Sequence, residues 1–181
     1  KSRTPEEISR YTTIMKKVVV AGVYHPELLV TNAGETIYED SGITLVLMRF
    51  VDGKSFLELD RPPSTDERKA VLEQAAKVNG IDHEPSYLFD SWAIPNIHVM
   101  FEKVRQHIEP EDLPLVEQVI AAYDAIPVDK LPLSFVHGDF TKANVIKGKD
   151  DKIYILDFSV ANRYPRIQEL SVIVANLLHD N

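Results

Sequence analysis

The stretch that decides the fold is F-V-H-G-D-F-T-K-A-N-V-I, residues 135–146, followed by I-Y-I-L-D-F, residues 153–158. Leu131 to Val136 predicts a short buried strand that leads into His137-Gly138, where glycine allows the backbone to turn sharply. The apolar segments on either side of the polar turn at 148–151 predict a β-hairpin. The sequence therefore predicts a strand, a loop and a hairpin in succession.

Three polar side chains, Asp139, Asn144 and Asp157, lie on the loop and at the two ends of the predicted hairpin. Asn144 and Asp157 stand at the outer ends of the two predicted hairpin strands, so their side chains are expected to lie side by side. An amide oxygen and a carboxylate in this position can share a hard cation such as Mg²⁺, which prefers oxygen ligands. Asp139 lies on the preceding loop, close enough to act as a base. The spacing predicts convergence on one metal-bound phosphate.

The motif H-G-D-x-x-x-x-N at 137–144 and the apolar strand ending in D-F at 157–158 resemble the aminoglycoside phosphotransferase and choline kinase-like family, relatives of the protein kinases. The resemblance implies a protein kinase-like α+β fold, with a partial small lobe and hinge at 1–52 and a mainly helical catalytic lobe at 53–181. It also implies an enzyme that transfers the γ-phosphoryl group of ATP to a hydroxyl of a small molecule. The implied cofactors are Mg²⁺ and ATP, with GTP as the alternative nucleotide.

The resemblance assigns a role to each residue of the motif. Asp139 would orient the substrate hydroxyl and accept its proton, while Asn144 and Asp157 would hold the metal ions. His137 would brace the loop through hydrogen bonds, and Lys142 would lean toward the transferring phosphate. These roles follow from the similarity and agree with the chemistry of the residue types.

The upstream part resembles the end of a kinase small lobe. Thr4-Pro5-Glu6-Glu7 is a capping box with proline at the first helical position, and predicts an N-terminal helix. The continuous apolar run from Ile43 to Met48 is typical of a strand buried on both faces. In the family, the hinge after this strand hydrogen-bonds the adenine edge, so the resemblance places Met48, Arg49 and Phe50 against the base.

The remaining segments predict mostly helices. Ser64 and Glu67 form a second capping box, and helical patterns follow at 91–107, 112–126 and 167–178. Pro95 is expected in the first turn of a helix that begins near Ile94, because proline breaks a helix interior.

Composition limits the possible partners. The chain has 181 residues, of which 44% are apolar, and no run approaches the eighteen or so apolar residues that a membrane span requires. A net charge of −8 argues against a nucleic-acid-binding surface. The absence of cysteine excludes disulfides and thiol chemistry, and fits a cytoplasmic protein. We expect a small-molecule partner and neither nucleic acid nor membrane; the oligomeric state stays open.

The sequence departs from the family pattern at both ends. None of the seven glycines forms G-x-G-x-x-G, and Lys1 has no apolar strand around it. The spacing from Gly22 places Tyr11 near the position of the glutamate that would pair with a strand lysine. Toward the end, Glu169 replaces the usual aspartate of a G-D-P-x-x-D-L-type segment. We expect the chain to be a fragment of a longer enzyme rather than a natural short form.

Two other functions stay open. One is a catalytically inactive kinase-like module with a binding or regulatory role. The other is a metal-dependent hydrolase that uses His137, Asp139 and Asp157, which is less favoured because such sites usually add a second histidine or carboxylate at close spacing. The acceptor of a kinase could be an aminoglycoside, another sugar, choline or an amino alcohol.

Overall fold

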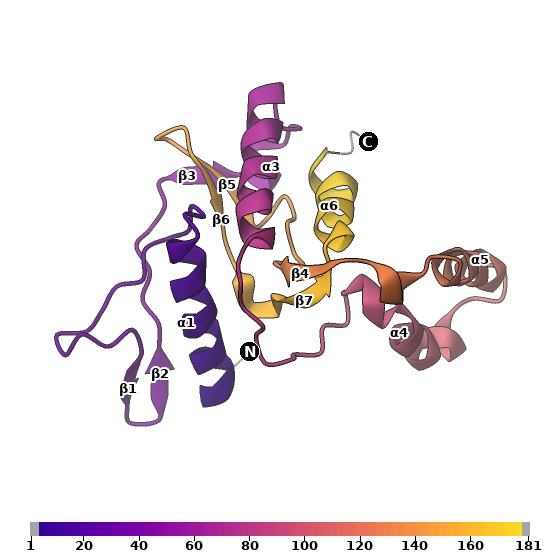
Figure 1. Cartoon of the computed structure of the whole chain (residues 1–181), viewed down its shortest axis with the longest axis horizontal. Helices are drawn as coiled ribbons and strands as arrows, with labels where there is room; N and C mark the ends of the chain where they lie inside the picture. Colours follow the sequence, from indigo (N-terminus) through magenta and orange to yellow (C-terminus); the bar gives the residue numbers. More distant parts are fainter. Residues whose placement is uncertain (1–3, 179–181) are drawn as a thin grey trace.

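A computed structural model describes residues 4–178, which form six α-helices and seven β-strands (Figure 1). In chain order these are α1 (Pro5–Val20), β1 (Tyr38–Asp40), β2 (Ile43–Leu45), β3 (Gly53–Ser55), α2 (Phe56–Leu59), α3 (Thr65–Asn79), α4 (Ile97–Val104), α5 (Leu113–Asp124), β4 (Leu133–Val136), β5 (Val145–Gly148), β6 (Ile153–Ile155), β7 (Asn162–Pro165) and α6 (Ile167–Ile173). Short 3₁₀ turns occupy Ile94–Asn96, Arg105–His107, Val128–Lys130 and Phe158–Val160, and a π turn, Val174–Leu178, follows α6. The predicted α+β class is confirmed.

Three small antiparallel sheets fix the positions of the loops. β5 and β6 form the predicted hairpin, and β3 pairs with the other edge of β5. β4 pairs with β7, so that Val136 lies opposite Asn162. Because β4 leads into the 137–144 loop and β7 follows the D-F segment, this pairing brings the two motif segments together.

The helix caps are those that the sequence predicts. In α1, the Thr4 hydroxyl accepts a hydrogen bond from the Glu7 backbone N–H, and Glu7 Oε2 accepts one from the Thr4 N–H. In α3, Ser64 and Glu67 form the same reciprocal pair. Each cap satisfies two backbone donors that would otherwise be unpaired at a helix start.

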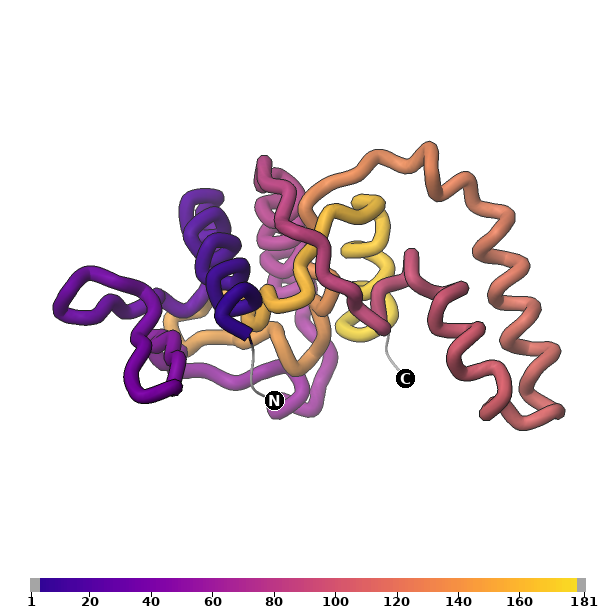
Figure 2. The backbone as a smooth tube through the Cα atoms, turned by 90° about the horizontal axis from the view of Figure 1, so that it is seen from below, coloured from indigo at the N-terminus to yellow at the C-terminus, as the bar shows by residue number. Residues whose placement is uncertain are grey.

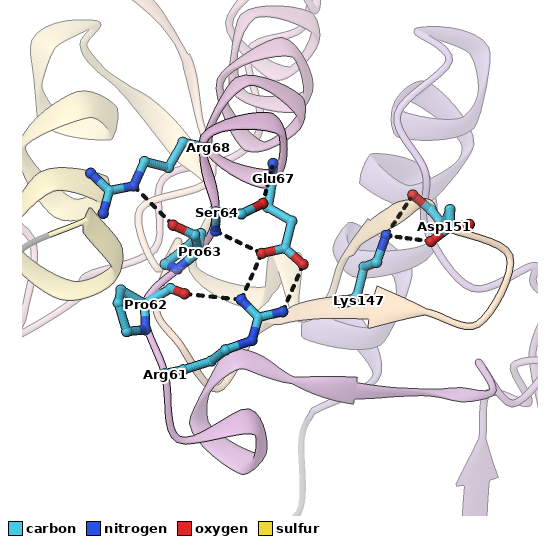
Figure 3. Close-up of polar contacts among 8 residues, drawn as sticks. All are labelled: Arg61, Pro62, Pro63, Ser64, Glu67, Arg68, Lys147 and Asp151. Atoms are coloured by element: carbon cyan, nitrogen blue, oxygen red, sulfur yellow. Dashed lines mark hydrogen bonds and ion pairs between the residues drawn. The ribbon is translucent and has the colours of Figure 1, made fainter.

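The cap of α3 is extended by an arginine (Figure 3). Arg61 donates two hydrogen bonds to the Glu67 carboxylate, at 2.7 and 2.8 Å, and a third to the Pro62 carbonyl at 3.0 Å. The hydrogen bonds from Arg61 are the main reason why the pKa of Glu67 falls to about 2. This bidentate pair ties the segment that follows α2 to the first turn of α3.

The prediction of a doubly buried strand from Ile43 to Met48 is wrong. Only residues 43–45 form a strand, β2, and the side chains of Ile43, Leu45 and Leu47 are more than half exposed. Within the described part of the chain β2 pairs with β1 alone, and the hairpin projects beside α1 (Figure 1). Within residues 4–178 no second layer covers the side chains of Ile43, Leu45 and Leu47, so the apolar composition of the run overstated its burial.

The main core gathers buried side chains from α1, α3, α6 and the strands of the hairpin. The aromatic rings at its centre, all fully buried, are those of Phe56, Phe135, Phe140 and Phe158. The pair α4 and α5 stands apart from this core in both views (Figures 1 and 2), and neither helix buries a residue fully. Among residues 4–178, no helix has the length and apolarity needed to cross a bilayer.

Candidate active site

His137 holds the loop that follows β4. Its ring donates a hydrogen bond from Nε2 to the Leu156 carbonyl at 2.7 Å, and its Nδ1 accepts one from the Asp139 N–H at 3.0 Å. Because a carbonyl only accepts and an amide N–H only donates, the ring is the neutral Nε2–H tautomer. Burial lowers its pKa to about 4, which keeps it neutral. Both nitrogens are used, so His137 braces the loop and is not a metal ligand.

Glu169 holds the same loop from α6. Its Oε1 accepts a hydrogen bond from the His137 N–H at 2.9 Å, and its Oε2 accepts one from the Gly138 N–H at 3.1 Å. Complete burial raises the pKa of Glu169 to about 7, although both backbone hydrogen bonds act in the opposite direction. Gly138 has φ +84°, a conformation that favours glycine. The sharp turn and the carboxylate together set the direction of the next residue, Asp139.

Asp139 and Asn144 are in direct contact. Asn144 Nδ2 donates to Asp139 Oδ2 at 2.6 Å and to the Asp139 carbonyl at 3.0 Å. Asp139 is half-buried, and this burial is the main cause of its raised pKa; the negative charges of Asp157 and Asp90 act in the same direction. Because Asn144 uses its Nδ2 hydrogens on Asp139, its Oδ1 is the atom that can serve as a cation ligand.

Asp157 faces the same cleft as Asn144. It adopts a left-handed conformation, φ 56° and ψ 67°, and its side chain accepts a hydrogen bond from the Ser159 N–H. The Leu156 N–H donates to the Asn144 carbonyl at 2.8 Å, which joins the two ends of the hairpin. Both side chains line a cleft of about 710 Å³. Asn144 therefore contacts Asp139 and shares this cleft with Asp157, whereas Asp139 itself is not among the residues that line the cleft.

Arg10 is a support of the site that the motifs do not indicate. From α1 its guanidinium donates to the carbonyls of Ser159 and Ala161 and to Asn162 Oδ1, and also to the Ser86 carbonyl. It thereby fixes the segment directly after Asp157. Three of its four acceptors are backbone carbonyls, 76, 149 and 151 positions away, which leave no side-chain signal in the sequence.

The predicted hinge residues separate into two groups. Met48 lines the cleft that contains Asn144 and Asp157, whereas Arg49 and Phe50 line a second pocket of about 420 Å³. The Arg49 N–H already donates to the Glu27 carbonyl at 2.9 Å. The contact of these three residues with a nucleotide base stays a prediction.

On the α1 side of the cleft, Tyr11 lies near the position where the family pattern has a glutamate, as the sequence indicates. Ile8 and Tyr11 line it, and the Tyr11 hydroxyl lies 3.7 Å from Met48 Sδ. Lys1 lies outside the described residues. Lys142 is half-buried, and its carbonyl accepts a hydrogen bond from the Leu57 N–H. Its predicted role at a phosphate is untested.

The donor atoms fit Mg²⁺ rather than a transition metal. Within residues 4–178 no three His, Asp or Glu side chains gather as a metal site. The candidate ligands are one amide oxygen, from Asn144, and one carboxylate, from Asp157. Mg²⁺ is commonly held by few protein oxygens and completes its coordination with phosphates and water. The geometry does not favour a metal-dependent hydrolase, since both ring nitrogens of His137 already form hydrogen bonds within the protein.

Comparisons with known proteins identify the family and the fold. The model of the "Phosphotransferase enzyme family" matches residues 1–180. The GDP complex of wild-type aminoglycoside 2′-phosphotransferase-IIIa overlays with a TM-score of 0.72 at 15% identity, covering 96% of this chain and 62% of that one. An aminoglycoside phosphotransferase from Alicyclobacillus acidocaldarius overlays with a TM-score of 0.69 at 11% identity, covering 97% and 59%. No curated protein sequence matches the chain.

A choline/ethanolamine kinase family protein from Mesorhizobium loti also overlays, with a TM-score of 0.60 at 18% identity, covering 88% of this chain and 51% of that one. At such identities the overlays show a shared fold, and they confirm the predicted protein kinase-like architecture. The chain spans only about half to three fifths of the length of these structures.

Proposed function

The chain belongs to the phosphotransferase enzyme family, and we propose that it transfers the γ-phosphoryl group of a nucleoside triphosphate to a hydroxyl of a small molecule. The observation that carries the proposal is the contact between Asp139 and Asn144 at 2.6 Å, beside a cleft that Asn144 shares with Asp157. ATP is the proposed nucleotide. GTP is the alternative, because the aminoglycoside 2′-phosphotransferase-IIIa structure contains GDP.

Asp139 is proposed as the base. Its carboxylate is held by Asn144, and its raised pKa increases its affinity for the hydroxyl proton. Asn144 Oδ1 and the Asp157 carboxylate would hold Mg²⁺, which when bound neutralises charge on the nucleotide phosphates. Met48 would contact the base of the nucleotide, and Lys142 the transferring phosphate. The two lobes, 1–52 and 53–181, would meet at this cleft.

The acceptor is proposed to carry a cationic nitrogen group as well as a hydroxyl, as aminoglycosides, choline and amino alcohols do. Three carboxylates support this choice, since the charges of Asp90 and Asp157 both act on Asp139. Asp90 is itself 8% exposed and lies in the loop that precedes α4. A cationic group near these carboxylates offsets their mutual repulsion. An uncharged sugar alcohol lacks this interaction.

The proposal is tested by calorimetric titration of the chain with ATP, and separately with GTP, with and without Mg²⁺. Asp157→Ala is expected to remove Mg²⁺-dependent nucleotide binding, because it deletes one of the two proposed metal ligands. Asp151→Ala is the matched control, since Asp151 lies on the exposed turn of the same hairpin. Equal nucleotide affinity in Asp157→Ala and the parent would contradict the assigned role.

Turnover is tested separately with Asp139→Asn. This variant is expected to keep nucleotide binding and to lose about 10²- to 10⁴-fold in phosphoryl transfer to an amino alcohol acceptor, the usual contribution of a general base. A variant that turns over at the parental rate would remove Asp139 from the mechanism.

A catalytically inactive kinase-like module is the second candidate. Tyr11 favours it, because this side chain lines the cleft where a glutamate is expected. This candidate predicts nucleotide binding without transfer to any hydroxyl in the same experiments.

A further inference from the structure

We propose that Asn162 is a positioning residue for the acceptor, because it ties the loop that carries Asp90 to the segment that follows Asp157. The inference rests on the proposed function, in which Asp157 holds Mg²⁺ and the charge of Asp90 favours a cationic acceptor. It adds the side chain that fixes the acceptor side of the site relative to the metal side.

The loop that carries Asp90 depends on other elements for its position. Residues 81–90, all within the described part of the chain, belong to no helix or strand. Asp90 ends this loop, and its Oδ1 accepts a hydrogen bond from the Trp92 N–H at 3.0 Å. Its negative charge contributes to the raised pKa of Asp139, so the two carboxyl groups lie near one another. Contacts that fix the loop therefore fix a charge beside the proposed base.

Asn162 supplies such a contact at Leu88, two positions before Asp90. Its Nδ2 donates to the Leu88 carbonyl at 2.8 Å, and its Oδ1 accepts a hydrogen bond from the Leu88 N–H at 3.4 Å. One amide thus pairs with both backbone groups of a loop residue, as a neighbouring strand would. Asn162 lies on β7 and is 1% exposed, so bulk water cannot take its place.

The same amide also contacts the metal side of the site. Asn162 Oδ1 accepts a hydrogen bond from Arg10 at 3.3 Å, and Arg10 donates to the Ser159 carbonyl at 3.0 Å. Arg10 further donates to the Ser86 carbonyl in the acceptor-side loop at 2.8 Å. The two side chains therefore form one hydrogen-bonded link between this loop and the segment after Asp157.

Asn162→Ala tests the inference in steady-state assays with choline, ethanolamine and kanamycin as acceptors. The variant is expected to raise the acceptor KM about tenfold and to leave kcat unchanged, because it frees the Asp90 loop but keeps Asp139 in place. Calorimetric titration is expected to give the parental Mg²⁺-nucleotide affinity. Asn79→Ala, the matched control, removes an amide hydrogen bond to the Phe135 carbonyl at 3.0 Å and should keep the parental acceptor KM.

A double-mutant cycle tests whether Asn162 acts through Asp90. If it does, adding Asn162→Ala to Asp90→Asn should raise the acceptor KM no further than Asp90→Asn alone. A side chain that only stabilised the fold would give additive changes in KM, so additivity would overturn the inference.

Asn162→Asp provides a second variant in case Asn162→Ala does not fold. It keeps oxygens that accept from the Leu88 N–H and from Arg10, but it has no donor for the Leu88 carbonyl. Its added negative charge would by itself lower the KM of a cationic acceptor. A raised KM in this variant therefore reports the lost hydrogen bond and not the change in charge.

The outcomes separate this inference from the function on which it rests. A parental acceptor KM in Asn162→Asp, or in a folded Asn162→Ala, would overturn the role of Asn162 and leave the proposed phosphotransferase activity intact. A parent that phosphorylates none of the three acceptors would contradict the proposed acceptor class and overturn the inference with it.

Discussion

Replacement of Glu169 by glutamine should change how the stability of the protein depends on pH. In the parent, this carboxylate accepts hydrogen bonds from the N–H groups of His137 and Gly138 and is completely buried. Glutamine keeps the shape and one acceptor oxygen but cannot ionise. The variant therefore isolates the contribution of ionisation at this position.

The magnitude follows from the two pKa values. Burial raises the folded-state pKa of Glu169 to about 7, against 4.5 for an ordinary glutamate. The folded protein thus binds the proton more tightly than the unfolded chain, so the contribution of Glu169 is complete below pH 4.5 and is lost as the pH rises through 7. The difference corresponds to about 3 kcal/mol of unfolding free energy.

The assay is urea unfolding of the parent and Glu169→Gln at intervals from pH 4.5 to 8. The unfolding free energy of the parent minus that of the variant is expected to fall by up to about 3 kcal/mol across this range. His25 and His137 act in the opposite direction, because burial lowers the pKa of each to about 4. Both histidines are present in both proteins, so their contribution cancels in the difference.

Glu67→Gln is the matched control. The pKa of Glu67 is lowered to about 2 by Arg61, so the contribution of Glu67 is present above pH 4.5 and is lost only as the pH falls toward 2. This variant should be less stable than the parent by a nearly constant amount from pH 5.5 to 8. A difference for Glu169→Gln that is equally constant, or that increases with pH, would refute the assignment of a raised pKa.

Two further predictions concern the supports of the loop. Gly138→Ala should cost about 1–2 kcal/mol of unfolding free energy, because φ is +84° at this position, and urea unfolding would measure the loss. The same variant should slow phosphoryl transfer in turnover assays. An unchanged stability would contradict the strain argument. Arg10→Met should weaken Mg²⁺-nucleotide binding several-fold, because it releases the segment after Asp157. Calorimetric titration would measure the change, with Lys16→Met, exposed on the same helix, as the control. Equal nucleotide affinity in Arg10→Met and the parent would count against a supporting role of Arg10.

The local parts of the structure were predictable because their causes are local. The capping boxes at Thr4 and Ser64 need only residues three apart, and the hairpin needs only a polar turn between apolar segments. Asp139 and Asn144 are only five positions apart, so one short loop can bring them into contact. Such features depend on few residues, so their sequence patterns are specific.

The parts that could not be predicted depend on distant segments. Arg10 binds carbonyls that are far away in the chain, and the exposure of Ile43 depends on whether another layer covers it. The sequence singles out Glu169 only as a replacement for an aspartate. Its hydrogen bonds to backbone groups 31 and 32 positions earlier require the folded arrangement of α6 under the loop.

The supports of the candidate site lie outside the cleft itself. Glu169 holds the loop from α6, His137 joins the loop to the Leu156 carbonyl, and Arg10 holds the segment after Asp157 from α1. The conformational entropy of the loop is therefore lost when the core folds. Ligand binding does not have to order the loop a second time. Substitution of Asp157 by asparagine, which tolerates the same left-handed conformation, should consequently change ligand affinity with little effect on stability. Substitution of Glu169 or Arg10 should change both, because these side chains connect the site to the core.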